Sequence, residues 1–139
     1  MLSRFTYMAL VFGMASASAS AADLTVVLEN TIPNGGNVRA AIYGQSADFL
    51  KKSLRGAESP VNGNSVTLVF KDLPAGDYAV TAFQDSNGNK KLDTSIVGIP
   101  LEPYGMSNDA RGGLDGAPKF SDAAFHLGDS DLTVRIQLK

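Results

Sequence analysis

Apolar and polar side chains alternate along much of this chain, and this alternation constrains its fold more than any other feature. It recurs in five runs, at residues 24–28, 38–42, 66–70, 78–83 and 132–138. Successive side chains of a β-strand point to opposite faces of the sheet, so each run predicts a strand with one buried face. Five or six short strands separated by turn residues favour a β-sandwich over a barrel, without excluding a barrel.

Two local signals predict how the early strands connect. Residues 34–37, Asn-Gly-Gly-Asn, tolerate positive φ and stand between the first two runs, so we expect those strands to form a hairpin. After the second run, Ser46 can cap a short helical turn that directs Phe49 and Leu50 inward. We expect this turn to be an insertion between strands.

Residues 72–80 carry a further turn signal. Pro74 presets φ for a tight turn, and Gly76 is expected to take its strained corner. The segment looks like the closing hairpin of immunoglobulin-like or transthyretin-like modules of exported proteins, in which a tyrosine, here Tyr78, packs near the corner. The predicted fold is therefore all-β, an immunoglobulin-like or transthyretin-like antiparallel β-sandwich with one long irregular loop segment.

That irregular segment covers residues 96–125, which are rich in Gly, Pro, Asp and Asn. A loop of this length is uncommon in a compact domain and is either functional or a misread element. Isolated apolar side chains are expected to anchor it to the sandwich, namely Ile99, Leu101, Tyr104, Met106, Leu114, Phe120 and Phe125.

The first 22 residues have the features of a cleaved signal peptide. Arg4 gives a positive start, residues 5–12 are a short apolar run, and residues 15–22 are a tract of alanine and serine. Cleavage before Asp23 fits best, although Ala19 and Ala21 also end acceptable frames. We therefore expect a single domain at residues 23–139 with a periplasmic or secreted location.

Charge and cysteine content limit the partners of this domain. The formal net charge of the chain is −2, and loss of the signal would remove Arg4 and make it −3. This mild acidic balance offers no basic footprint for nucleic acid or anionic lipid. The chain has no cysteine, so its stability must come from the core, helped by any bound ion. We expect a monomer without stable membrane insertion once the signal is removed.

Oxygen-bearing side chains recur at every second position after the fourth run and predict a calcium site. Calcium-binding loops supply side chains at relative positions 1, 3, 5 and 9 and a backbone carbonyl at 7. In this chain these are Asp85, Asn87, Asn89 and Asp93, with the carbonyl of Lys91. All five are hard oxygen ligands, which favour calcium over zinc or copper.

The same loop also fits a simpler interpretation. Asn87-Gly88 is a strong turn signal by itself, and the flanking aspartates can merely solvate the turn. Glu102 is close enough in sequence to return as a further ligand, which favours the ion. Ile96 stands where a calcium loop would have its final glutamate, and Lys90 and Lys91 lie beside the site, which favours the turn.

Several short motifs together resemble the DUF2141 family of uncharacterised exported bacterial proteins. They lie at residues 74–79, 85–89, 98–100, 104–108 and 118–123, in the family's order, and the resemblance covers essentially the whole chain after the signal. It implies a small exported β-sandwich of unknown biochemical role.

One position departs from the family pattern. The family usually has glycine after the second asparagine of the acidic loop, where this chain has Lys90. A non-glycine residue there costs about 1 kcal/mol or more in strain if its φ is positive.

No catalytic constellation accompanies these motifs. His126 is a lone histidine between Phe125 and Leu127, and Asp109, Asp115 and Asp122 are more simply turn formers than a carboxylate pair acting on sugars. The function expected is a non-enzymatic binding or structural accessory protein of the cell envelope. The alternative is a carbohydrate-active or other hydrolytic enzyme that uses the loop carboxylates.

A ligand surface is expected in the irregular segment if the domain binds an envelope protein or a glycan. Glu102, Tyr104 and Phe120 are its candidate residues. The alternative is that the two aromatic side chains cover an open edge of the sheet. This alternative is favoured, because a segment without strands of its own needs apolar anchors.

Overall fold

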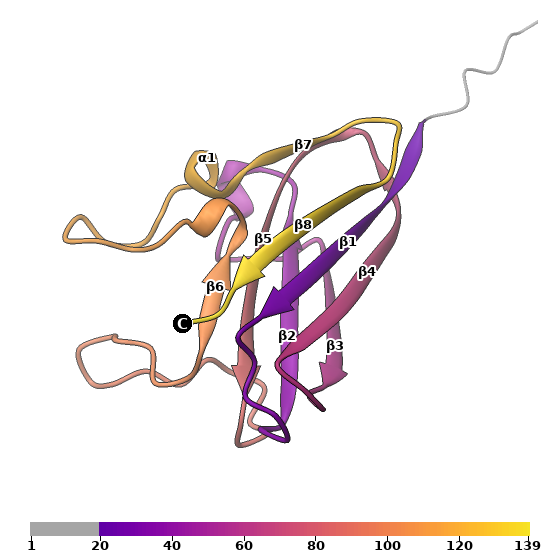
Figure 1. Ribbon diagram of the computed structural model, residues 1–139. Helices are drawn as coiled ribbons and strands as arrows, with labels where there is room; N and C mark the ends of the chain where they lie inside the picture. Colours follow the sequence, from indigo (N-terminus) through magenta and orange to yellow (C-terminus); the bar gives the residue numbers. More distant parts are fainter. Residues whose placement is uncertain (1–19) are drawn as a thin grey trace, which may run out of the picture.

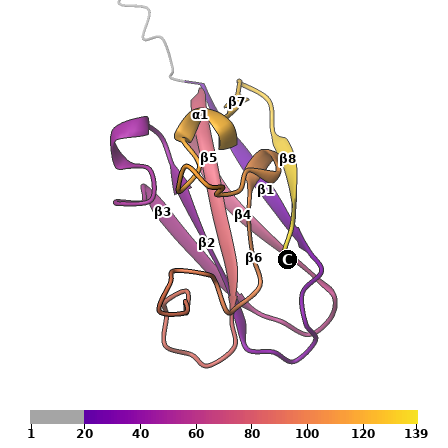
Figure 2. The same cartoon turned by 90° about the vertical axis from the view of Figure 1, so that its left-hand side faces the viewer.

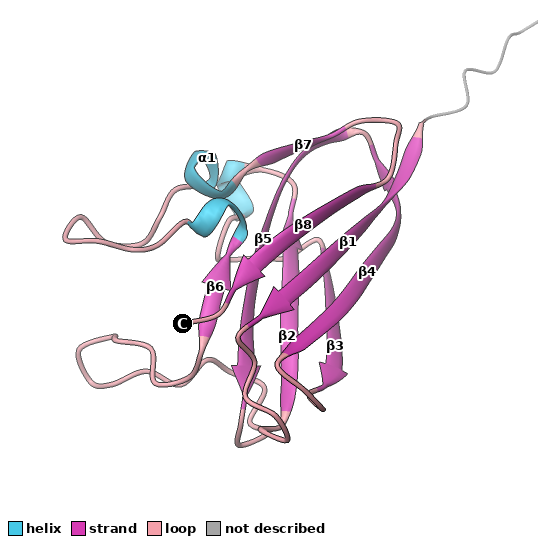
Figure 3. Ribbon diagram, viewed as in Figure 1, coloured by secondary structure: helices cyan, strands magenta, loops and turns pink. Residues whose placement is uncertain are grey.

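The computed structural model describes residues 20–139 and consists of strands with three short helical turns (Figures 1 and 3). The strands are β1 (Ala21–Glu29), β2 (Asn37–Tyr43), β3 (Arg55–Pro60), β4 (Ser65–Pro74), β5 (Gly76–Asp85), β6 (Tyr104–Met106), β7 (Phe125–Leu127) and β8 (Leu132–Gln137). The helical turns are η1 (Ser46–Asp48), η2 (Ser107–Asp109) and α1 (Phe120–Ala123).

The strands form two sheets that pack face to face, which confirms the predicted β-sandwich. The first sheet has the order β4-β1-β8, and the second has the order β3-β2-β5-β6, with β7 also paired to β5. The strand β1 is antiparallel to β4 but parallel to β8, so the expectation of a wholly antiparallel fold is wrong for this pair. A parallel pair needs a long connection, and here most of the chain lies between its two strands.

The core lies between the sheets and is made by the alternating positions that the sequence indicates. Leu24, Val26 and Leu28 of β1 are fully buried. They belong to one continuous apolar cluster with the inward side chains of the other strands. Its further members include Val38, Ala40, Ile42, Val66, Leu68, Phe70, Tyr78, Val80, Ala82, Leu127 and Ile136.

The predicted hairpin between the first two strands is wrong, because β1 and β2 belong to different sheets. Asn34 and Gly36 do take positive φ, of 58° and 86°, but the turn carries the chain across the sandwich. The side chain of Gln84 stabilises this crossing by bonding both the N–H and the carbonyl of Ile32 and the carbonyl of Gly35. The two strands therefore face one another across the core and do not pair within one sheet.

The turn at residues 74–76 is also a corner between sheets rather than a hairpin within one sheet. It joins β4 to β5, which lie in different sheets. Positive φ falls on Asp72, at 54°, and not on Gly76 as predicted. Tyr78 packs at the corner as expected, and its hydroxyl donates a hydrogen bond to the carbonyl of Pro74 at 2.6 Å.

The predicted helical turn exists as η1, but two of its details differ. Gln45 occupies the capping position, and no side chain caps the turn there, whereas Ser46 lies inside it. Phe49 is buried as expected, while Leu50 adopts a φ of 61° and is exposed. The left-handed backbone at Leu50 turns its side chain away from the core.

The segment predicted to be irregular contains β6, η2 and α1 and leads into β7. Met106 and Phe120 pack against a second apolar cluster, around Tyr43 and Phe49. Leu114 is instead exposed, as are Ile99 and Leu101, so these three predicted anchors are wrong. The chain therefore folds back onto the sandwich at a few points and leaves the rest as loops.

The two edges of the sandwich are closed in different ways. At one edge, Tyr104 of β6 and Lys139 exchange backbone hydrogen bonds of 3.1 and 3.0 Å. Gly105 lies so close to β8 that a Cβ added there would be 2.7 Å from the carbonyl oxygen of Gln137. At the other edge, the Arg55 side chain donates to the carbonyls of Lys71 and Asp72 at 2.6 and 3.2 Å.

The N-terminal part of the predicted signal peptide, residues 1–19, lies outside the described residues. Ala21 and Ala22, which were assigned to its end, begin β1, and Ala22 is buried opposite Leu73. No helix within residues 20–139 is long and apolar enough to cross a membrane.

Replacing Tyr78 by phenylalanine should lower the free energy of unfolding by about 1 kcal/mol, because it removes the hydrogen bond to Pro74 and keeps the packing. Denaturant unfolding at neutral pH measures the change. Tyr43→Phe is the matched control, since this tyrosine is similarly buried but no hydrogen bond of its hydroxyl is found within residues 20–139. Equal losses in both variants would contradict the corner hydrogen bond.

Candidate functional site

The candidate site is the loop between β5 and β6, residues 86–103, together with the last residue of β5. It contains the Asp/Asn series and projects from one end of the second sheet (Figure 1). Two buried carboxylates, Asp85 and Glu102, stand at its two ends, with 2% and 6% of their surfaces exposed. A buried carboxylate is costly unless it is paired or hydrogen-bonded, so their partners define the site.

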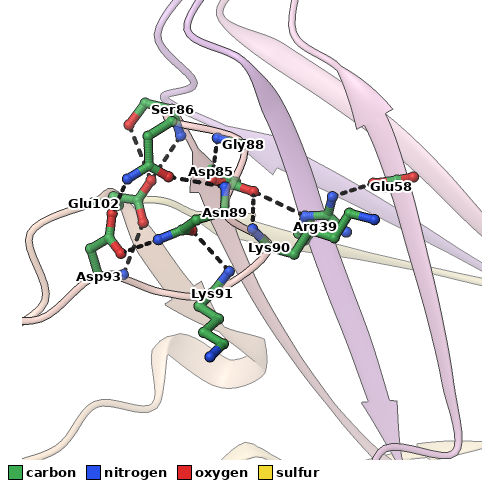
Figure 4. Close-up of polar contacts among 11 residues, drawn as sticks. Arg39, Glu58, Asp85, Ser86, Gly88, Asn89, Lys90, Lys91, Asp93 and Glu102 are labelled. Atoms are coloured by element: carbon green, nitrogen blue, oxygen red, sulfur yellow. Dashed lines mark hydrogen bonds and ion pairs between the residues drawn. The ribbon is translucent and has the colours of Figure 1, made fainter.

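Asp85 faces the interior of the loop and the neighbouring strand β2 (Figure 4). Its two oxygens accept hydrogen bonds from the N–H groups of Gly88 and Lys90, each at 2.9 Å. The Nε of Arg39 donates to the same carboxylate at 3.2 Å, and Arg39 also pairs with Glu58 at 2.8 Å. Asp85 therefore ties the start of the loop to β2 and β3.

These contacts set the ionisation of Asp85. Burial acts to raise its pKa, but the hydrogen bonds from Lys90, Arg39 and Gly88 outweigh burial and hold the pKa below its usual value of 3.8. The carboxylate is therefore ionised at neutral pH, as a ligand for a cation or a partner for Arg39 must be.

Asp93 is the centre of a second group of contacts. The side-chain amides of Asn87 and Asn89 both donate hydrogen bonds to its carboxylate. The amide oxygen of Asn87 accepts from the N–H of Asn89 at 3.2 Å, and that of Asn89 accepts from the N–H of Lys91 at 3.0 Å. The structure therefore brings Asn87, Asn89 and Asp93 together, while the carboxylate of Asp85 bonds Arg39 and two backbone N–H groups of the loop.

Glu102 returns to the loop, as its position in the sequence suggests. One of its oxygens accepts from the backbone N–H of Ser86 at 2.8 Å and from the hydroxyl of Ser86 at 3.1 Å. The other accepts from the N–H of Asp93 at 2.9 Å. Glu102 thus joins both ends of the Asp/Asn series and brings the chain to the start of β6.

The loop backbone is strained at the position where this chain departs from the family. Lys90 has a φ of 64°, in the left-handed region that glycine tolerates and a lysine does not favour. Gly88, two residues earlier, has a φ of 73°. Lys90 therefore has the positive φ at which the sequence predicts backbone strain.

The donor atoms of the loop are of the type that calcium prefers. The side chains of Asn87, Asn89 and Asp93 carry carboxylate and amide oxygens, and hard oxygens are the usual ligands of this ion. In the structure the amide NH₂ groups face the carboxylate of Asp93, and the amide oxygens accept from backbone N–H groups. Within residues 20–139 no group of three or more His, Cys, Asp or Glu side chains is arranged to hold a metal. An ion bound here would rely on amide and backbone oxygens and would replace the amide contacts of Asp93.

Tyr104 and Phe120, the candidate aromatic ligands, do not form one surface with the loop carboxylates. Tyr104 lies in β6 with the guanidinium of Arg111 4.8 Å from its ring centre. Phe120 begins α1 and packs edge-on against Phe49, with ring centres 5.9 Å apart. Both side chains are half-buried, which agrees with the interpretation that they cover the edge of the sandwich.

Two polar residues that support the loop and its neighbours, half-buried Arg39 and buried Ser107, were not singled out from the sequence. Arg39 is one, because nothing in its own strand marks it as the partner of Asp85. Ser107 is the other, since its hydroxyl bonds the N–H of Val80 at 3.0 Å and the carbonyl of Ala123 at 2.6 Å. Ser107 lies in the Tyr-Gly-x-Ser-Asn motif, which was the only signal for it.

The fold and the loop define a small β-sandwich protein with a self-bonded Asp/Asn loop at one edge. The chain belongs to the DUF2141 family, described as uncharacterised proteins conserved in bacteria, whose model matches residues 26–135. This confirms the resemblance found from the motifs. Comparisons with curated proteins and with solved structures gave no match, so the immunoglobulin-like or transthyretin-like topology stays a prediction.

Replacing Lys90 by glycine should raise the free energy of unfolding by about 0.5 to 1 kcal/mol, because relief of the left-handed strain exceeds the entropy that glycine adds to the unfolded chain. Thermal or denaturant unfolding measures this. Lys91→Gly is the matched control, since its φ is not positive and the same change should be destabilising. A loss of stability in Lys90→Gly would contradict the strain.

The unfolding free energy should fall as the pH drops below about 3.8, in part through Asp85. Its pKa is lower in the folded state than in the unfolded state, so its contribution is complete above the unfolded value. The contribution disappears as the pH falls through the folded value. Denaturant unfolding between about pH 7 and pH 2.5 should show a weaker pH dependence for Asp85→Asn than for the parent chain. Equal slopes would contradict this assignment.

Proposed function

We propose that this protein is a non-enzymatic binding or structural accessory protein of the cell envelope, exported to the periplasm or secreted, in which calcium stabilises the Asp/Asn loop. The observation that carries the proposal is the convergence of Asn87, Asn89 and Asp93. These are three of the five ligands that the spacing predicts, and each carries a hard oxygen. Binding of the ion would require the two amides to rotate, so that their oxygens replace the NH₂ groups that now face Asp93.

The ion would act on the structure through the ends of the loop. Glu102 bonds Ser86 at one end of the Asp/Asn series and Asp93 at the other, and it lies two residues before β6. Tightening the loop would therefore also fix β6, which closes one edge of the sandwich. An ordered edge of this kind is a suitable place for an envelope protein or a glycan to bind.

The arrangement of the loop carboxylates supports a non-enzymatic role. Catalysis of hydrolysis by carboxylates needs one that can donate a proton and one that can attack or activate water. Asp85, Asp93 and Glu102 each accept hydrogen bonds from N–H donors with both oxygens. A hydrolytic role for the loop would require these contacts to be given up on binding substrate.

Calcium should raise the melting temperature of the protein. A ligand that binds only the folded state at a hundredfold excess over its Kd stabilises by about 2.7 kcal/mol. Melting is compared in chelator, in millimolar calcium and in millimolar magnesium, and the rise should be specific to calcium. The variant Asp93→Asn should lose the rise, because it removes the carboxylate around which the amides gather.

Asp115→Asn is the matched control, since this aspartate is exposed in a different loop and should leave the calcium effect unchanged. An identical melt in chelator and in calcium would reject the ion and leave a self-bonded turn. Hydrolysis of a glycan by the parent chain, abolished in Asp93→Asn while the fold is retained, would favour the enzymatic alternative.

A further inference from the structure

Two loops of this protein present aliphatic side chains entirely to solvent. In the first loop, residues 86–103, Ile96 is 106% exposed and Val97 is 76% exposed. In the second loop, residues 110–119, Leu114 is 109% exposed. Ile99 and Leu101 of the first loop are exposed as well. Single exposed aliphatic residues are ordinary, but four within six residues of one loop form an apolar patch that requires an explanation.

The shape of the first loop keeps these side chains outward. Its tip is a small turn closed by backbone hydrogen bonds from Ser95 to Ile99 and from Gly98 to Ser95, at 2.8 and 2.9 Å. The N–H of Leu101 donates to the carbonyl of Asp93 at 2.8 Å, which anchors this turn to the Asp/Asn series. The backbone thus pairs with itself, and the aliphatic side chains stay exposed beside the part of the chain that the structure describes.

The second loop has the same construction. Gly113 and Gly116 exchange backbone hydrogen bonds of 2.9 and 3.0 Å, so Leu114 stands at the tip of a narrow turn. Both loops project on the side of the molecule where β6 lies (Figure 1), and turning that side toward the viewer brings both to the front (Figure 2). One flat surface could therefore meet both tips.

The charges that the first loop presents to solvent are positive, although the chain as a whole is acidic. Its buried or half-buried carboxylates, Asp93 and Glu102, face inward and are engaged by N–H donors. Lys90 and Lys91 are exposed, and neither forms an ion pair within residues 20–139. Lys90 and Lys91 belong to the same loop as the aliphatic tip and lie nearer the sandwich, with Lys90 beside Arg39 of β2 (Figure 4). In the second loop, exposed Asp115 beside Leu114 is balanced by exposed Lys119. An anionic surface that meets both tips would therefore face a positive balance of exposed charge.

We propose that the two loop tips dock this protein reversibly on an anionic phospholipid surface. The aliphatic side chains would enter the boundary between headgroups and acyl chains, and Lys90 and Lys91 would contact lipid phosphates. A lipid surface fits better than a protein groove because the tips are separate and convex. Protein interfaces also concentrate binding in tyrosine, tryptophan and arginine rather than in leucine and valine. This inference goes beyond the proposed function and does not require the loop to bind calcium.

Binding to vesicles tests the proposal. The purified protein is sedimented with vesicles of phosphatidylcholine alone or mixed with phosphatidylglycerol, in chelator and then in calcium. We expect binding to the anionic vesicles already in chelator. A failure of the calcium proposal would therefore leave this binding unchanged, and the two proposals can be tested separately. The combined variant Ile96→Ser, Val97→Ser and Leu114→Ser should bind at least about tenfold more weakly. Lys90→Gln with Lys91→Gln should lose roughly fivefold for each charge removed.

The matched control is Ile32→Ser with Val69→Ser, which changes two other exposed aliphatic residues outside both loops and should leave binding unchanged. A second readout uses fluorescence, because the chain has no tryptophan. Leu114→Trp should shift its emission to the blue when anionic vesicles are added, whereas Val69→Trp should not.

Three results would overturn the proposal. One is the absence of binding to either kind of vesicle, and another is equal binding by the parent chain and the three-residue tip variant. The third is self-association in sedimentation that the tip variant abolishes while no vesicle binds, which would assign the tips to a contact between two copies of the chain.

Discussion

Burial of one face of β1 is the constraint on which the rest of the structure depends. This strand is the middle of its sheet, with β4 on one side and β8 on the other, and Leu24, Val26 and Leu28 are fully buried on its inner face. A shift of one residue in register would expose all three, so the pairing is strongly specified. Because β8 runs parallel to β1, the chain after β8 lies beside Tyr104 of β6. The candidate loop leads into β6, so this contact holds the end of the loop at that edge.

Strands were predictable where their inward positions are apolar, which includes β1, β4, β5 and β8. Strand β3 was missed because its sequence, Arg-Gly-Ala-Glu-Ser-Pro, offers only Ala57 to the core. Pairing was harder to predict than the strands themselves. The Asn-Gly signal at residues 34–37 suits a hairpin and a crossing between sheets equally well. The choice depends on Gln84, a buried residue about fifty positions away whose amide bonds the crossing backbone.

The candidate loop was predictable to the extent that its contacts are local. Regular spacing brings Asn87 and Asn89 to Asp93 within one turn of chain, and the return of Glu102 follows from its proximity in sequence. The partner of Asp85 could not be anticipated, since Arg39 precedes it by 46 residues and meets it only because β2 pairs with β5. The positive partner of Asp85 therefore comes from the sheet and not from the loop motif, so the motif alone does not reveal it.

The unlike edges of the sandwich have a consequence for how the molecule opens. At the β6 edge, separation of the sheets must break paired backbone hydrogen bonds between Tyr104 and Lys139. At the β3 edge, the hydrogen bonds between β3 and β4 that are found within residues 20–139 are those of the Arg55 side chain to its two carbonyl partners. Local opening is drawn from the regions with the fewest such bonds. Local opening should therefore begin at the β3 edge, and amide protons of β3 should exchange with solvent before those of β6.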